Sequence, residues 1–161
     1  MHTAAALLDT HTRAHRSFVK LLDHCAGFSP DQLSQQLNGF GYPNVRLQLH
    51  HMVGAEVYWV GVLRGLMLVD ERPEDFASID AIRAYRERVA ATTADYLTQA
   101  SEAELNTRRK MTTWGGVELE LMPAHIILRT QVHIFQHQGQ IAAMARLLGR
   151  PIPAGLDFPL G

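Results

Sequence analysis

A long helical segment near the C-terminus, residues 123–148, most constrains how this chain can fold. Pro123 can open a helix and Gly149 can end it, and apolar residues recur between them at intervals of three and four. The resulting stripe contains Ile126, Thr130, His133, His137, Ile141, Met144 and Leu148. His133 and His137 are about one helical turn apart, so both imidazoles leave the same apolar side. The segment therefore predicts an amphipathic helix with two polar rings on its buried face.

Three further segments, about 3–26, 45–68 and 78–100, show the same helical periodicity. Asn44 is a good N-cap for the second of these segments. Between the first two, SPDQLSQQL predicts a short helix, because Ser29 can cap it, Pro30 suits its first position and Gln32 completes a capping box. A polar, proline-containing connector is expected at 70–75.

Strand-like alternation occurs in one place, just before the last helix. Residues 111–114 and 117–121 alternate around Gly115 and Gly116, which predicts a small β-hairpin. The last twelve residues contain three prolines and cannot continue as helix, so we expect them to wrap across the helices. The predicted fold is an all-α four-helix bundle with a short extra helix and a hairpin, in a single domain spanning 1–161.

Composition argues against several classes of function. The 161 residues carry 15 basic and 16 acidic side chains, a net charge of -1, without the basic face of a nucleic-acid-binding protein. Cys25 is the only cysteine, so no internal disulfide and no cysteine-based zinc site can form, which fits a reducing compartment. The N-terminus lacks the features of a signal peptide, and no apolar run is long enough to span a membrane. We therefore expect a cytoplasmic protein that binds neither nucleic acid nor membrane.

The buried histidine pair needs a partner, because burying an unpaired polar group is costly. A divalent metal ion is one such partner, with His51 on the second long helix as the leading third ligand. His50 is the alternative, but it lies about 100° away on a more polar track of the same helix. Gln140 shares the side of His133 and His137 and could hydrogen-bond in the pocket. From spacing alone, hydrogen-bonded core histidines without a metal remain the competing interpretation.

Other polar residues on apolar faces have two interpretations each. Glu56 could orient a ligand histidine or act as a base, or it could form a salt bridge with an arginine such as Arg129. His11 and His15 could form a second site, supply hydrogen bonds to the first, or fill the core. His125 lies too far along its helix to join His133, and we expect a structural or surface role.

Three familiar catalytic patterns are absent. No Glu-x-x-His occurs, which excludes a ferritin-like di-iron site. Residues 134–136 are Ile, Phe and Gln, which excludes a His-Glu-x-x-His zincin motif. A nucleophile pair of Cys25 and His24 is not expected either, because adjacent helix residues diverge and Cys25 lies on an apolar stripe, which is typical of a core residue.

Two stretches resemble the DinB-like (DNA-damage-inducible) superfamily. HHMVGAEVYWVGVLRG resembles its second-helix motif, in which a histidine precedes an Ala-Glu and an aromatic residue. HIFQHQGQIAAMARLLGRPIP resembles its last-helix motif, His-x-x-x-His followed by Gly-Gln and a Leu-Gly-x-Pro ending. The order of helices and the hairpin also match, so the resemblance covers nearly the whole chain.

The resemblance implies an up-down-down-up four-helix bundle, often a homodimer, with a three-histidine site. The ligands would be His51, His133 and His137, holding zinc or nickel in the first instance, with iron or manganese as alternatives. His11 and His15 lie where such proteins often have polar residues near the metal, so a fourth ligand stays open. Gln138 replaces the usual His or Arg after the last ligand, which argues against a substrate contact there.

Three functions follow as hypotheses. Relatives of this kind include S-transferases that use bacillithiol, mycothiol or glutathione, so the first is a metal-dependent thiol S-transferase acting on a small electrophile in detoxification or stress response. The second is a hydrolase that uses metal-bound water, with Glu56 as a possible base. The third is a metal-stabilised bundle that binds a small molecule or partner without catalysis.

Overall fold

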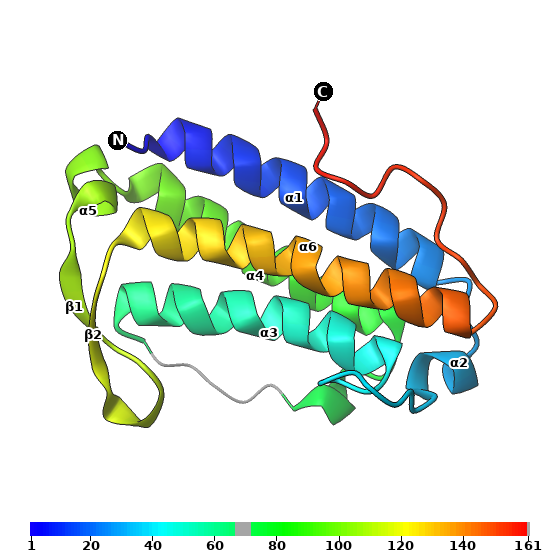
Figure 1. Cartoon of the computed structure of the whole chain (residues 1–161). Coiled ribbons are helices and arrows are strands. Elements are labelled where there is room, and N and C mark those ends of the chain that lie inside the picture. Colours follow the sequence, from blue (N-terminus) through cyan, green and yellow to red (C-terminus); the bar gives the residue numbers. More distant parts are fainter. Residues whose placement is uncertain (67–71, 161) are drawn as a thin grey trace.

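Four long helices form the body of the protein. This computed structural model describes residues 1–66 and 72–160, and the helices are α1 (Ala4–Cys25), α3 (Val45–Arg64), α4 (Ile79–Gln99) and α6 (Pro123–Leu147). Helices α1 and α6 run in one direction, and α3 and α4 run in the other (Figure 1). Each helix packs against two neighbours, in the cyclic order α1, α4, α3, α6. The predicted four-helix bundle, with its up-down-down-up directions, is confirmed.

Side-chain caps fix where the helices begin. The Asn44 side chain accepts a hydrogen bond from a backbone N–H in the first turn of α3, and Ser78 does the same for α4. Ser29 and Gln32 exchange hydrogen bonds in a capping box that starts the short α2 (Pro30–Ser34). These groups satisfy backbone donors that have no partner within the helix, which is why the starts were predictable.

The end of α3 differs from the prediction. The helix ends at Arg64, because Gly65 adopts the left-handed conformation (φ 65°) and its N–H bonds to carbonyls of the last turn. Leu66, within the predicted helix 45–68, follows this ending and is 50% exposed. Residues 67 and 68, predicted as the end of this helix, lie outside the described residues. Of the connector predicted at 70–75, residues 70 and 71 also lie outside them, and Pro73–Asp75 forms the 3-10 turn η1.

A short helix and a hairpin connect the end of α4 to the start of α6. The short α5 (Glu102–Asn106) comes first and was not predicted, although Ser101 caps it through the N–H of Glu104. Strands β1 (Arg109–Thr112) and β2 (Glu118–Leu121) then pair antiparallel around the turn η2 (Trp114–Gly116). Figure 1 shows the hairpin at the end of the bundle where α3 finishes and α6 begins. The predicted hairpin is confirmed, but its first strand begins and ends two residues earlier than expected and its second strand begins one residue later.

The C-terminal segment lies across the bundle, as expected from its prolines (Figure 1). The Leu156 carbonyl accepts hydrogen bonds from the Ser17 hydroxyl of α1 and the Gln138 side-chain amide of α6. The Arg13 guanidinium donates to the Pro159 carbonyl further along. Gln138 therefore holds the C-terminal segment against α6.

Apolar side chains fill the interior on both sides of a polar middle section. Among the described residues, no helix has a long enough apolar stretch to cross a membrane. The buried polar groups at the centre include His11, His15, Glu56 and Thr93, and His137 lies nearby between α3 and α6. These polar groups form two separate clusters.

Candidate metal centre

Three histidines converge between α3 and α6. His51 on α3 faces His133 and His137 on α6, and one ring nitrogen from each lies within 4.8 Å of the other two. The Nε2 atoms of His51 and His133 are 3.0 Å apart, so the N–H of one ring donates a hydrogen bond to the Nε2 of the other. Nitrogens that share a tetrahedral zinc ion are about 3.4 Å apart, close to this separation. We call His51, His133 and His137 the histidine triad.

Two glutamines orient the last histidine of the triad. The Nδ1–H of His137 donates to the Oε1 of Gln48 at 2.5 Å, which leaves its Nε2 with a free lone pair. The Gln48 amide in turn donates to the Gln140 side chain at 2.8 Å and to the Tyr42 carbonyl at 3.0 Å. This is the arrangement in which an outer residue fixes the tautomer of a metal-binding imidazole. Gln140 therefore contacts Gln48 and no histidine of the triad, and it is not among the residues that line the adjoining pocket.

An aromatic ring holds His51 in place. Tyr42 stacks on the His51 imidazole with ring centroids 4.0 Å apart and an angle of 23° between the planes. The same tyrosine meets His137 edge-on at 6.2 Å. The rotation of the His51 ring is restricted as a result, because stacking covers one of its faces.

The triad favours neutral imidazoles, which is the form that binds a metal ion. Burial, followed by the neighbouring imidazoles, lowers the pKa of His51 to about 4. Burial, His137 and Arg129 lower the pKa of His133 to about 4, and burial lowers the pKa of His137. All three rings are therefore neutral at neutral pH, and each carries a proton on only one of its two nitrogens.

The structure also decides between His51 and its neighbour. His50 lies against Phe76 and Tyr85, with ring centroids 5.2 and 5.7 Å away, on the side of α3 that faces away from the triad. His125 is exposed and meets His2 edge-on at 5.6 Å. The preference for His51 over His50, and the separation of His125 from the triad, agree with the structure.

The second cluster is centred on Glu56, which is 2% exposed. Its Oε1 accepts hydrogen bonds from His11 Nε2 at 2.8 Å and from the Thr93 hydroxyl at 2.6 Å. Its Oε2 accepts one from His15 Nε2 at 2.9 Å. These partners come from α1 and α4, so the cluster ties three helices together at the centre of the bundle.

The hydrogen bonds within this cluster give Glu56 its ionised form. Burial alone would raise the pKa of Glu56, but its interactions with His15 and His11, which include a hydrogen bond from each, hold that pKa well below its usual range. Burial is also the main cause that lowers the pKa of His15, and Arg86 Nε donates to its Nδ1 at 3.1 Å. His15 is therefore neutral and keeps its proton on Nε2, where it donates to Glu56.

Glu56 consequently has a different environment from the one predicted. It orients neither His51, His133 nor His137, and Arg129 lies over the Trp59 ring instead, 5.2 Å from its centroid. Both the triad and the Glu56 cluster bring together three groups that could hold a metal ion. The triad has an accessible side and lone pairs available, whereas the nitrogens of His15 are already committed to Arg86 and Glu56.

An open pocket of about 560 Å³ adjoins the triad. Its walls come from α3, α6 and the hairpin, and its lining residues are Tyr42, His51, Gly54, Ala55, Tyr58, Trp59, Thr113, Trp114, Leu119, Arg129 and His133. Tyr58 and Trp114 stack with centroids 4.5 Å apart, and the Tyr58 hydroxyl accepts a hydrogen bond from the Trp114 backbone. Sequence analysis gave no role to Trp114 or Tyr42, because their approach to the triad depends on loop paths.

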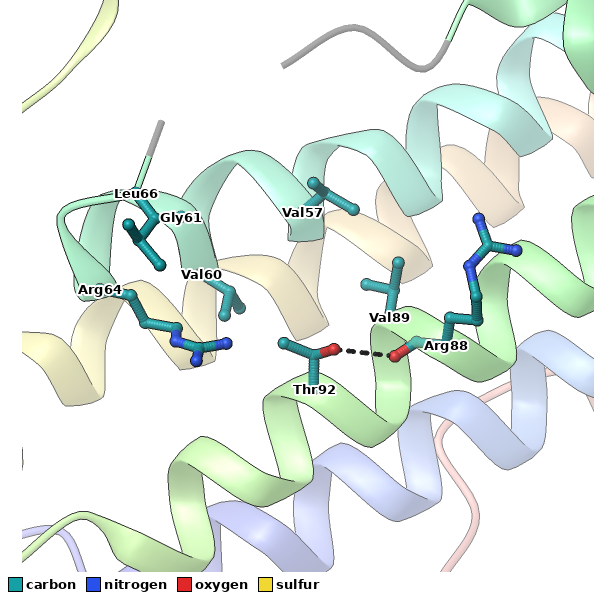
Figure 2. Close-up of a pocket in the computed structure, with 8 residues that line it drawn as sticks. All are labelled: Val57, Val60, Gly61, Arg64, Leu66, Arg88, Val89 and Thr92. Atoms are coloured by element: carbon teal, nitrogen blue, oxygen red, sulfur yellow. Dashed lines mark hydrogen bonds between the residues drawn. The ribbon is translucent and has the colours of Figure 1, made fainter. Parts of the chain in front are cut away.

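A smaller hollow of about 180 Å³ lies between α3 and α4. Figure 2 shows Val57 and Val60 on one side and Val89 and Thr92 on the other, with arginines at its two ends. No predicted site residue lines it. It is therefore separate from the triad and its pocket.

We predict that the metal-free protein becomes less stable as the pH falls from about 6.5 to about 4. The folded pKa of His51 and of His133 is about 4, below the ordinary value of 6.5, so the unfolded chain binds more protons in this window. Urea unfolding at several pH values would measure the slope. The His133→Ala/His137→Ala variant should show a shallower slope, and parallel curves for the two proteins would contradict the prediction.

Comparisons with known proteins agree with the fold. A model of the DinB family matches residues 1–160. The crystal structure of a conserved protein from Enterococcus faecalis is similar, with a TM-score of 0.66 and 17% sequence identity, over 92% of this chain and 98% of that chain. At this identity the likeness supports the fold alone. No curated protein matches the sequence.

Proposed function

The chain belongs to the DinB family, and on that basis we propose that it is a divalent-metal-dependent thiol S-transferase. It would join a low-molecular-weight thiol to a small electrophile in detoxification or stress response. The observation that carries the proposal is the position of the histidine triad, which lies at the wall of an open aromatic pocket. Three imidazoles beside a ligand-sized space are typical of a catalytic rather than a structural metal centre.

The residues present fit a metal ion. The triad supplies three neutral nitrogen donors, which suit zinc, nickel or iron(II). Gln48 fixes the tautomer of His137 so that Nε2 is the available donor. When bound, a divalent ion would act as a Lewis acid that favours the thiolate form of a thiol near neutral pH.

The protein's own residues would bind and orient the second reactant. Tyr58, Trp59 and Trp114 give the pocket aromatic walls, which can take up an apolar electrophile and exclude water. Gly54 and Ala55 keep the α3 side of the pocket open, because neither has a large side chain. In the transfer, a bond forms between the thiolate sulfur and the electrophilic atom, and the leaving group departs with its electron pair.

Two alternatives are distinguished by the same site. For a hydrolase, Glu56 was the candidate base, but it is buried among His11, His15 and Thr93 and does not line the pocket. A non-catalytic binding bundle would use the pocket without turnover. Glu56 is therefore not the base of a hydrolase at this site, and the dependence of turnover on an added thiol separates hydrolysis from transfer.

The test is an activity assay with metal-loaded protein. We expect conjugation of a chromogenic electrophile such as 1-chloro-2,4-dinitrobenzene to need both the metal and a thiol, drawn from glutathione, bacillithiol and mycothiol. Chelator-treated protein and the His133→Ala/His137→Ala variant should be inactive. Turnover of 4-nitrophenyl acetate without thiol would instead support the hydrolase, and no turnover under any condition would support the binding bundle.

A further inference from the structure

The lining of the pocket beside the triad carries a positive charge and no negative one. Among its described lining residues, Arg129 is the only one with a permanent charge, and none is an aspartate or glutamate. Within residues 1–66 and 72–160, no carboxylate forms an ion pair with Arg129. The adjoining groove, which shares Trp59 and Arg129 with this pocket, adds Arg108 and Glu120, whose charges cancel. Arg129 therefore contributes a positive charge that no described acidic group in the pocket offsets.

The position of Arg129 relates this charge to the triad. Arg129 precedes His133 by four residues on α6, which is about one helical turn or 6 Å along the axis. Its guanidinium lies 5.2 Å from the centroid of Trp59. A guanidinium that lies over an aromatic ring can still bind a carboxylate with two parallel hydrogen bonds, through the N–H groups that do not point at the ring.

The rest of the pocket suits a flat apolar body. Tyr58 and Trp114 stack almost parallel, at an angle of 9°, and Tyr58 meets Trp59 edge-on at 5.0 Å. Trp114 is 57% exposed and Leu119 is 43% exposed, although both line the pocket. Exposed apolar side chains around a concave site typically mark the place where a ligand binds.

We propose that the pocket binds an aromatic carboxylate, with Arg129 as the anchor for the carboxylate and the aromatic walls as the site for the ring. For the proposed transferase, the substrate would be an aromatic acid that also carries an electrophilic carbon with a leaving group, and this part of the proposal rests on the proposed function. Arg129 is then a specificity-determining residue that binds substrate without reacting with it.

Binding of 2-naphthoate tests the proposal, with 2-naphthamide as its neutral analogue. Both would be titrated calorimetrically into metal-free and zinc-loaded protein. We expect naphthoate to bind more tightly than naphthamide in both forms. The Arg129→Gln variant should weaken naphthoate binding about 10- to 100-fold and leave naphthamide binding unchanged. Arg146→Gln, an exposed arginine near the other end of α6, is the matched control and should bind like the wild type.

Three results would overturn the proposal. These are equal binding of the acid and the amide, a preference for the acid that survives in Arg129→Gln, and a preference that occurs only in zinc-loaded protein. The last result would mean that the metal, not Arg129, holds the carboxylate. The titrations of metal-free protein measure binding alone, so their result does not depend on whether the S-transferase assay succeeds. Circular dichroism of each variant checks that it is folded.

Discussion

Zinc at a thousandfold excess over its dissociation constant will raise the free energy of unfolding of the wild-type protein by about 4 kcal/mol. The reason is that the triad joins His51 of α3 to His133 and His137 of α6, and these nitrogens meet only in the folded state. The His133→Ala/His137→Ala variant removes two of the three donors and should gain almost nothing from zinc. Urea unfolding followed by circular dichroism, with and without zinc, measures both gains.

A matched control separates this effect from general zinc binding by histidine. His125 lies on the same helix but is exposed and contacts His2 rather than the triad. His125→Ala should therefore keep the full gain from zinc. If the double variant were stabilised as much as the wild type, the triad would not be the metal centre.

Replacing Glu56 with alanine will lower the free energy of unfolding of the metal-free protein by about 3–5 kcal/mol. The change leaves the ring nitrogens of His11 and His15 and the Thr93 hydroxyl without the acceptor they share. All four groups are buried, so water does not readily replace the lost carboxylate. Denaturant unfolding at neutral pH measures the loss.

The surface residue Glu118 provides the control for this substitution. Its side chain is exposed on β2, so Glu118→Ala should change stability by no more than about 0.5 kcal/mol. Glu56→Ala should also leave the zinc affinity of the folded protein close to that of the wild type, because Glu56 does not contact the triad. If Glu56→Ala lowered the free energy of unfolding by less than about 1 kcal/mol, the hydrogen bonds of Glu56 with His11, His15 and Thr93 would not stabilise the bundle as proposed.

The sequence predicted both ends of α1, α4 and α6 to within about one residue, and only the end of α3 was misplaced. Asn44 and Ser78 are caps whose role depends only on the next few residues, so local sequence was sufficient. For α3, periodicity alone predicted a helix that continues past Gly65 to Leu68. A glycine at this point allows the left-handed conformation that ends the helix. Ser101 and Glu104 have the spacing of a capping box and could have revealed α5.

The candidate site was predictable where one helix face determines it. His133 and His137 share a face of α6, and His51 lies on the apolar side of α3, so their convergence follows from packing the two apolar sides together. Glu56 could not be assigned in this way, because its partners come from α1 and α4. The periodicity of α3 shows only that Glu56 points inward, while the helix that it meets depends on the order of packing.

The two histidine pairs show the same limit of sequence analysis, namely that the pattern of one helix does not reveal which residues of other helices it will contact. His11 and His15 have the spacing of His133 and His137 and also lie on an apolar stripe, yet they meet a carboxylate instead of a third imidazole. Gln48 was missed as well, although it lies three residues before His51, close to the same face of α3. Its contact with His137 would have been a reasonable expectation once α3 and α6 were paired.

Metal analysis of the purified, untagged protein tests the central claim most directly. Protein prepared without chelator is expected to contain about one equivalent of a divalent metal such as zinc, nickel or iron, bound by the triad. The His133→Ala/His137→Ala variant, purified in parallel, is expected to contain essentially none. Metal retained by the variant, or no metal in the wild type even after reconstitution, would contradict the claim that the triad is a metal centre.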